Sequence, residues 1–388
     1  MPDVTPAAIP TIRTLFPMSY LNTLDQIVAG QLDALAPETD KEGRFPRPVI
    51  DALAKAGLMG LVSSKDVGGM GLGLAEASAV VSRLAQSCPS TAMIVCMHYC
   101  AVAVLEQFGD KTVRTEIAAG RHLTTLAFSE VESRSHFWAP ASTAKKEDDS
   151  IVLDARKSWI TSAFEADSYV WSSKPVAAEG ASSIWLVDAK AQGLTLAAPF
   201  NGMGMRGNAS SPVTASGVRI PAANALGDDG KGFDIMMGVV LPWFSVLNAS
   251  CSVGTMEGSL ARAIAHVGGT RHQHLDTSLA DIPTIRAYLA RARIKTDMAN
   301  ALLQDTLAAI GSNRADTMLR VLEIKAACAE TALEVTDVAM RVCGGAAFRK
   351  EVGVERLFRD ARASHVMAPT TDVLYDFIGK AVTGLPLF

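Results

Sequence analysis

This sequence has little excess charge of either sign, and it has few cysteines. The 388 residues include 36 Lys and Arg against 40 Asp and Glu, which gives a formal net charge of −4. Nucleic acids and anionic membrane surfaces both favour a basic protein surface. We therefore expect neither of them as the main partner.

The six cysteines do not form a recognisable disulfide framework. They lie in apolar stretches such as AMIVCMHYCAVAVL, which is typical of buried free thiols in a reducing compartment. No unbroken apolar run reaches the roughly 20 residues of a transmembrane helix. Residues 1–16 lack the charged start and apolar core of a signal peptide. We predict a soluble cytoplasmic protein with no membrane partner.

Hydrophobic residues are abundant, at 49% of the chain, and they fall into three blocks of different periodicity. Residues 1–120 carry Ala, Leu and Val at helical spacing. Residues 121–231 contain short alternating runs separated by turn residues, which predicts a small antiparallel β domain or barrel. Residues 232–388 return to helical spacing. The chain is thus predicted to be mainly α with a central β domain.

Helix punctuation supports the two helical blocks. In the segment 45–61, FPRPVIDALAKAGLMGL, Pro48 lies near the predicted start of an amphipathic helix and Gly57 near its end. The segments 278–310 and 318–345 have apolar residues recurring at three and four, and both are long enough for helices of a bundle.

Trp159 and Thr161 lie two residues apart in the alternating segment LDARKSWITSA. Alternation at period two predicts that both lie on one face of a strand. A flat polar ring can pack on the indole while the hydroxyl bonds a ring nitrogen. The alternative is a tryptophan in a β core.

Two glycine-rich segments invite a phosphate-binding interpretation. Gly344 and Gly345 follow a long helix, which indicates first a helix C-cap and second a close approach of backbone to a phosphate or sugar. The segment 68–73, GGMGLG, follows no clear strand and lacks the Lys-Ser/Thr ending of a phosphate loop. We predict that it only connects helices.

His98 lies between Cys96 and Cys100. On a helix the two cysteines share a face, and the histidine points about 160° away from each. This set cannot form a tetrahedral metal site, so we predict no metal and favour a structural histidine. The segment HLTTLAFSEVESRSHF, by contrast, ends in a loop dense in hydrogen-bonding groups. Such a loop is either a binding site or simply solvated.

Taken together and in order, these segments resemble the acyl-CoA dehydrogenase superfamily of flavoproteins across nearly the whole chain. The motifs that carry the resemblance are AGLMGLVSSKDVGGMGLG, LAFSEVESRS, RKSWITSA, GMGMRGNASSPVTASGVRIPAANALG, TRHQHL and MRVCGGAAFRKEVGVERLFRDARASHVMAP. The resemblance implies an N-terminal helical domain, a middle β-barrel and a C-terminal four-helix bundle. It also implies a homotetramer or dimer, with FAD held at the subunit interface.

The resemblance further implies which residues contact FAD. Trp159 and Thr161 would meet the isoalloxazine, and Ser129 would lie near its pyrimidine side. The other residues implied as cofactor contacts are Arg271, Gly344, Gly345 and Thr370.

The catalytic carboxylate of the family is absent. Family members that desaturate acyl thioesters remove the α-proton with a glutamate while a hydride goes to flavin N5. Here Ala368, followed by Pro369, takes the place of that glutamate. A second subgroup carries the glutamate early in the first bundle helix, and the matching region around Ser245 has no carboxylate either.

Three hypotheses follow from this departure. The first is a dehydrogenase of an acyl thioester, such as a CoA thioester, that delivers electrons to an electron-transfer flavoprotein. Its α-proton would be removed by a displaced base, for which Asp372, Glu130 and His365 are the candidates.

The second hypothesis is a monooxygenase or oxidase on the same fold, which uses reduced flavin and O2 and needs no α-proton base. It would depend on FAD or FMN and on a flavin reductase, with His98, Ser129 and His136 as candidate polar groups beside the flavin. The third hypothesis is a flavin-binding subunit that has lost catalysis.

Overall fold

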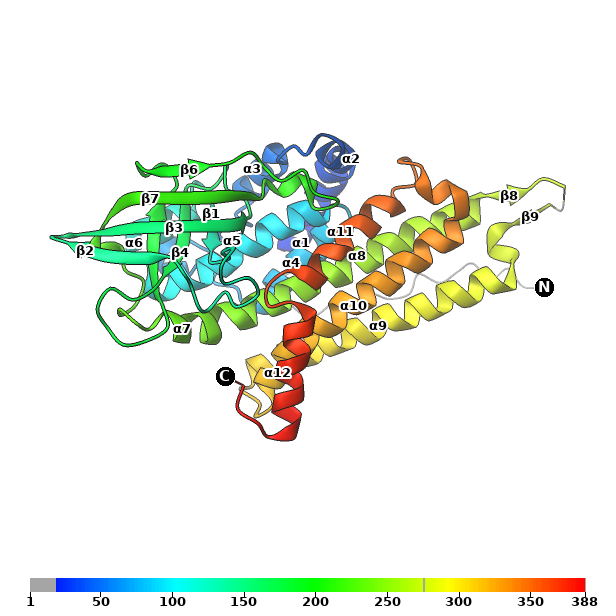
Figure 1. The fold of residues 1–388 in the computed structure, drawn as a ribbon. Coiled ribbons are helices and arrows are strands. Elements are labelled where there is room, and N and C mark those ends of the chain that lie inside the picture. The colour runs from blue at the N-terminus through cyan, green and yellow to red at the C-terminus, as the bar shows by residue number, and fades with distance from the viewer. Residues whose placement is uncertain (1–18, 275, 388) are drawn as a thin grey trace.

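The computed structural model describes residues 19–274 and 276–387. Residues 1–16, where we predict no signal peptide, lie outside the described residues. The molecule is elongated, with the strands of the β block gathered at one end and the long C-terminal helices running to the other (Figure 1). The helical, β and helical blocks follow the order that the sequence predicts.

The first block is helical. Its α-helices are α1 (Ser19–Ile27), α2 (Asp33–Glu42), α3 (Arg47–Lys55), α4 (Leu74–Ala85), α5 (Pro89–Phe108) and α6 (Lys111–Ala118), with a π-helical turn over Val28–Leu32. The expected punctuation of α3 is confirmed, because Pro48 lies in its first turn and Gly57 follows its end with φ +74°. GGMGLG lies in the connection before α4, as predicted.

Helix α5 is the centre of the core, because apolar residues occur on all of its faces and nearly all of them are buried. Both α5 and the segment 232–269 are long and apolar enough to cross a membrane by composition alone. Within the fold, however, 78% and 83% of their most apolar windows are buried. Their hydrophobicity is accounted for by packing inside the protein.

The β block forms two sheets. Its strands are β1 (Thr124–Ala127), β2 (Thr143–Glu147), β3 (Ser150–Ile160), β4 (Ser168–Ser173), β5 (Ser183–Asp188), β6 (Leu194–Leu196) and β7 (Ser211–Pro221). One sheet has the order β1-β4-β5 and the other β2-β3-β7-β6. The prediction of purely antiparallel pairing is wrong at one place, because β1 and β4 run parallel. Local alternation in the sequence carries no information about which distant strand becomes the neighbour.

The C-terminal block contains α7 (Gly232–Ile235), α8 (Leu241–Gly269), α9 (Pro283–Gly311), α10 (Thr317–Cys343), α11 (Val354–Val366) and α12 (Thr371–Thr383). Helices α8, α9, α10 and α11 pack together as the four-helix bundle. A short hairpin of β8 (Arg271–His272) and β9 (Thr277–Ser278) closes its far end, and α12 projects away from the bundle (Figure 1). Helix α5 packs on both β1 and α8, so the three blocks meet around it.

Candidate functional site

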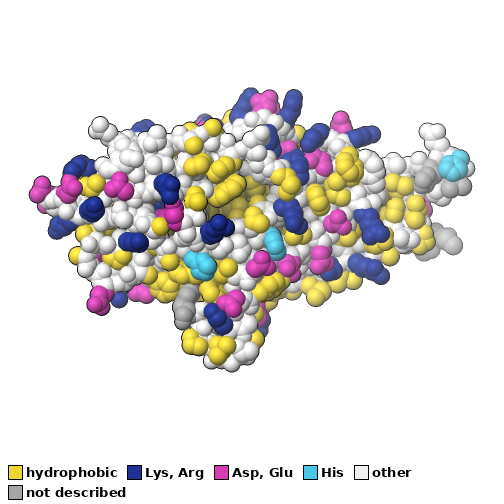
Figure 2. All heavy atoms as spheres, in the orientation of Figure 1, with side chains coloured by type: hydrophobic (Ala, Val, Ile, Leu, Met, Phe, Trp, Pro, Cys, Tyr) yellow, Lys and Arg dark blue, Asp and Glu magenta, His cyan; other side chains and the backbone are white. Residues whose placement is uncertain are grey.

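A cavity of about 620 Å³ lies where the three blocks meet. In the space-filling view, a hollow lined by hydrophobic side chains opens between the β domain and the C-terminal helices (Figure 2). One wall is apolar and comes from α5, the loop after β1, the start of α8 and the end of α11. Its members include Met93, Met97, Phe128, Val240, Phe244 and Met367.

The polar part of the lining, called the polar wall below, comes from the β domain. Ser129, Ser158, Thr161 and Ser210 all line it. The Ser158 amide donates to the carbonyl of Ser129 at 2.9 Å, and the hydroxyls of Thr161 and Ser210 lie 3.5 Å apart. These bonds hold three chain segments, far apart in sequence, against the cavity.

Trp159 is brought to this cavity by an irregularity in β3. The strand register shifts between Lys157 and Ile160, and Trp159 has φ +58°. Its side chain is 62% exposed, and its ring stacks on Phe200 with centroids 3.9 Å apart. The prediction that alternation places Trp159 and Thr161 on one strand face is wrong, because the bulge breaks the alternation and Thr161 lies beyond the strand. Both residues nevertheless line the cavity.

Left-handed backbone conformations of residues other than glycine gather around the same cavity. Arg134, Trp159 and Met205 line it and have φ values of +49°, +58° and +52°. Ser162 and Ala209, which adjoin lining residues, have φ values of +59° and +51°. Such conformations cost about 1–3 kcal/mol each and tend to cluster at functional sites.

The polar wall fits a flavin ring. An isoalloxazine is flat and aromatic with a polar edge, and the wall offers a largely exposed indole beside clustered hydroxyl groups. Of the residues implied as contacts of FAD, the structure brings Ser129, Trp159 and Thr161 together here. The flavin would therefore be held by this wall.

The remaining implied FAD contacts lie elsewhere in the chain. Arg271 lies in the hairpin at the far end of the bundle, where it pairs with Asp276. Gly344, with φ +56°, caps the C-terminus of α10 as the helix-cap interpretation predicts, and Gly345 follows it. Thr370 lies at the N-terminus of α12 without a side-chain capping bond. None of the four lines the cavity of its own chain.

Glu130 is the one carboxylate among the described residues that line the cavity, and both of its oxygens already accept hydrogen bonds from other residues. It accepts hydrogen bonds from the Lys157 ammonium at 2.6 Å, from the amides of Ala141 and Ser142, and from the Ser142 hydroxyl. Burial raises the pKa of Glu130, but the Lys157 charge and these hydrogen bonds more than offset it, so that the pKa is lowered. A carboxylate that holds its charge so firmly is a poor proton acceptor at neutral pH.

Ala368 lines the cavity, and the segment around it is held from behind by a buried lysine. Lys325 of α10 donates to the carbonyls of Ser364, Met367 and Pro369 at 3.1, 3.0 and 2.8 Å. Burial lowers the pKa of Lys325 to about 7. Position 368 thus carries a methyl group, and the Lys325 side chain holds the backbone on both sides of it.

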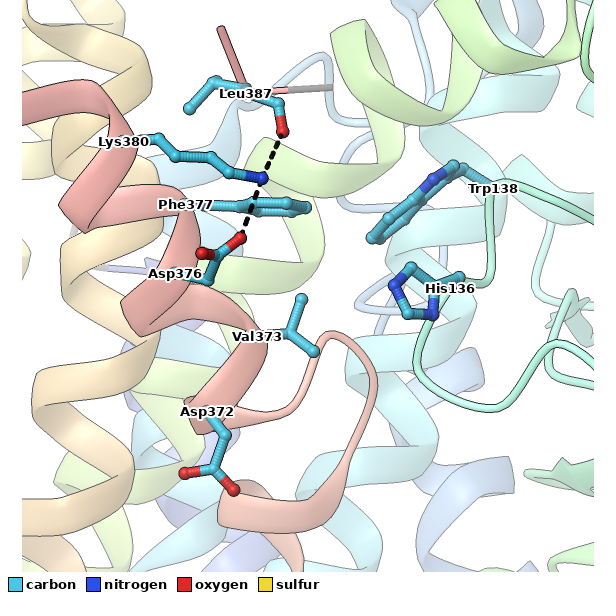
Figure 3. A pocket seen from close by; sticks show the side chains of 8 residues that line it. All are labelled: His136, Trp138, Asp372, Val373, Asp376, Phe377, Lys380 and Leu387. Atoms are coloured by element: carbon cyan, nitrogen blue, oxygen red, sulfur yellow. Dashed lines mark hydrogen bonds and ion pairs between the residues drawn. The ribbon is translucent and has the colours of Figure 1, made fainter. Parts of the chain in front are cut away.

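Asp372 and His136 line a separate hollow of about 410 Å³. In the close-up, His136 and Trp138 on the loop face α12, whereas the Asp372 carboxylate lies toward the other end of the hollow (Figure 3). Lys380 in this hollow pairs with Asp376 at 2.9 Å. Neither Asp372 nor His136 lines the cavity beside Trp159.

The two remaining histidine candidates also lie outside the cavity. His98 is buried, with Nε2 3.0 Å from the carbonyl of Met59 and Nδ1 accepting from the Thr124 amide at 3.2 Å. Burial lowers its pKa to about 4, which keeps the ring neutral, and these contacts favour the structural interpretation. His365 is half-buried near the end of α11, and its Nδ1 is buried with no hydrogen-bond partner among the described residues.

Lys157 and Lys325 are functional candidates that sequence reasoning misses, whereas Arg134 belongs to the polar loop that the sequence already offers as a binding site. Lys157 is preceded by a charged residue in a strand, so nothing local shows that it is fully buried. Lys325 is the lysine in the apolar stretch IKAACAETAL of α10, and that isolation is a usable signal of a buried cation. The polar loop that contains Arg134 has no periodic pattern, so the sequence does not predict that this side chain lines the cavity.

Models of three known domains together match most of the chain. The N-terminal domain of acyl-CoA dehydrogenases matches residues 19–120, the middle domain matches 125–218, and the C-terminal domain matches 230–383.

Individual proteins show the same likeness. The mitochondrial short-chain specific acyl-CoA dehydrogenase of Sus scrofa is 27% identical over 352 residues, covering 88% of this chain and 84% of the relative. Among solved structures, butyryl-CoA dehydrogenase from Megasphaera elsdenii has a TM-score of 0.89 at 21% identity, covering 97% of this chain and all of the other. TdsC from Paenibacillus sp. A11-2, solved with FMN and indole, has a TM-score of 0.85 at 19% identity, with 96% and 99% covered.

Proposed function

The chain belongs to the acyl-CoA dehydrogenase family of FAD-dependent oxidoreductases, and we propose that it is a monooxygenase or oxidase within that family. In this reading the flavin is reduced elsewhere, for example by a flavin reductase, and the reduced flavin supplies two electrons to O2 in the presence of a small apolar substrate. The chain's own residues hold the ring, shape the substrate space and keep water out.

One observation carries this proposal: the described residues that line the cavity offer no free carboxylate to remove an α-proton. Position 368 is alanine, and Glu130 is bound by Lys157, Ser142 and Ala141. Asp372, His98 and His365 do not line the cavity. A reaction with O2 requires no such base, and the structure of TdsC with FMN and indole is an example of this fold binding a flavin together with an apolar ring compound.

The two walls would have different roles, one binding the flavin and the other the substrate. Trp159, Thr161 and Ser129 would hold the flavin ring on the β side. Met93, Met97 and Phe244 would surround the substrate on the helical side, where an apolar lining excludes water from the reduced flavin.

Oxygen consumption by the FAD-loaded protein tests this proposal. With NADH and a flavin reductase, we expect O2 uptake that increases when a small apolar probe such as indole is added. In a parallel anaerobic experiment, butyryl-CoA should leave the oxidised flavin spectrum unchanged. Anaerobic bleaching of the flavin by butyryl-CoA, without O2 uptake in the first experiment, would refute the proposal.

The second candidate is a dehydrogenase of an acyl thioester, which the 27% identity to a short-chain acyl-CoA dehydrogenase favours. It would pass electrons to an electron-transfer flavoprotein and would use a displaced base. Asp372 is the carboxylate nearest in sequence to Ala368, so Asp372→Asn is the direct test, with Asp376→Asn as a control on the same helix. Loss of turnover in the first variant alone would support this candidate.

Assembly would complete the cofactor site. Arg271 in β8 and Gly344 and Gly345 after α10 lie at the end of the bundle away from the β domain (Figure 1). We propose that they reach the FAD of a second copy in a dimer or tetramer. Arg271→Ala should then weaken FAD binding while leaving riboflavin binding unchanged, as measured by fluorescence titration.

A further inference from the structure

Arg134 is a cation at the cavity with no partner of its own. It lines the cavity, its side chain is exposed, and among the described residues that side chain makes neither a hydrogen bond nor an ion pair. The two glutamates of the same loop are paired with other residues: Glu130 with Lys157, and Glu132 with Arg156. The guanidinium therefore contributes an uncompensated positive charge to the cavity.

The loop that carries Arg134 is well anchored. The Arg134 amide donates to the carbonyl of Glu130 at 3.1 Å, and the Glu130 side chain binds the amides of Ala141 and Ser142 at the other end of the loop. Arg134 itself has φ +49°, a conformation that favours glycine and is costly for arginine. A residue kept at such a cost is a candidate for a binding role.

A guanidinium pairs best with phosphate or carboxylate, because its planar fork can donate two parallel hydrogen bonds. We propose that Arg134 forms an anion-binding subsite of the cavity, which takes a phosphate or carboxylate group of a bound ligand. This inference rests on the proposed function only in that the cavity holds a flavin. The anion has two possible sources, a phosphate of the cofactor or an acidic group of the substrate.

Ligands that share a flavin ring or a butyryl thioester, with and without phosphate groups, distinguish these sources. Full-length protein freed of flavin is titrated with riboflavin, FMN and FAD, followed by flavin fluorescence. It is also titrated with butyryl-CoA and with the uncharged thioester S-butyryl-N-acetylcysteamine, followed by calorimetry. Each titration compares the wild type with Arg134→Gln, Arg134→Lys and the control Arg156→Gln, which removes an exposed arginine that does not line the cavity.

A charge-assisted hydrogen bond contributes roughly 1.5–3 kcal/mol, so we expect Arg134→Gln to weaken the relevant anionic ligand by roughly 10- to 100-fold. Loss for FMN and FAD but not riboflavin assigns the subsite to the cofactor phosphate. Loss for butyryl-CoA but not the uncharged thioester assigns it to an acidic group of a ligand other than the cofactor. Arg134→Lys should restore part of the affinity, and added salt should reduce the wild-type advantage.

Two results would overturn the inference. One is unchanged binding of all five ligands by Arg134→Gln, and the other is an equal loss for charged and uncharged members of each pair, which would indicate a structural role for the loop. If the wild type binds none of the three flavins, the proposed function fails separately. The two thioesters then still test the anion subsite.

Discussion

The Lys157 ammonium donates a hydrogen bond to Oε1 of Glu130 at 2.6 Å, and both side chains are buried next to the polar wall of the cavity. The same ammonium also donates to the carbonyl of Ser172 at 2.7 Å. Burial lowers the pKa of Lys157 to about 8, so the ammonium is still charged at neutral pH. The pair fixes the loop after β1 to the strands, and it occupies the carboxylate that would otherwise be available as a base.

Glu130→Gln should reduce stability strongly. The substitution leaves the buried Lys157 charge without a counter-ion, and breaking a buried pair from one side costs about 3–5 kcal/mol. Urea unfolding of the purified protein measures the change. Glu132→Gln is the matched control, because its pair with Arg156 is largely exposed and should contribute about 0–1 kcal/mol.

The double variant Glu130→Gln with Lys157→Met separates this role from catalysis. Removing both charges should recover much of the lost stability, since no buried ion remains unpaired. Turnover per folded molecule should also persist. Stability that is restored while turnover is abolished would instead assign Glu130 to the chemistry.

His98 should make the protein sensitive to mild acid. Its folded pKa of about 4 lies below its ordinary value of 6.5, so between these values the unfolded chain binds a proton that the folded protein does not. Stability is therefore lost as the pH falls from 6.5 toward 4. At roughly 1.4 kcal/mol per pH unit, the contribution is on the order of 3 kcal/mol.

The measurement is the free energy of unfolding at several pH values between 7 and 4, in the wild type and in His98→Gln. Glutamine can still bond the carbonyl of Met59 but does not titrate. The variant should lose less stability than the wild type over this range. Parallel curves would show that the histidine is not held neutral by the fold.

The order of blocks and most helices can be predicted from sequence because periodicity is a local property. Helix α3 is an example, since Pro48 and Gly57 mark its two ends directly. The pairing of β1 with β4 is not local, and neither is the bulge that turns Trp159 into the cavity. The first depends on β4 and the second on β7, and both partners are distant in sequence.

The candidate site shows the same division. Ser129, Trp159 and Thr161 can be chosen from motifs, because each motif names residue types in a fixed order. The roles of the other candidates depend on their ion-pair and hydrogen-bond partners, which the sequence does not reveal. Glu130 is a suitable base by residue type, but in the fold it is paired with Lys157. Asp372 lies only four residues from Ala368 in sequence, but it lines a different hollow.

Lys325→Met should loosen the segment that carries Ala368. The substitution removes the donor for three carbonyls, and each buried carbonyl left without a partner costs roughly 1–3 kcal/mol. Hydrogen exchange should increase most at residues 364–371. Lys295→Met, which breaks only a partly exposed pair with Glu334, is the control and should change stability by about 0.5 kcal/mol or less.

Trp159→Ala should weaken flavin binding without unfolding the protein. The indole is 62% exposed, so its removal leaves no buried cavity, and Phe200 loses only its stacking partner. Aromatic stacking contributes about 0.5–1.5 kcal/mol beyond buried area, so we expect affinity for FAD to fall by roughly tenfold once the lost area is included. Trp159→Phe should retain most of the affinity because it keeps a ring.

The measurement is quenching of flavin fluorescence, with the position of the long-wavelength absorption band as a second readout. Affinity and absorption that are both unchanged in the alanine variant would mean that the ring lies elsewhere in the cavity, and the assignment of the polar wall to the flavin would have to be abandoned.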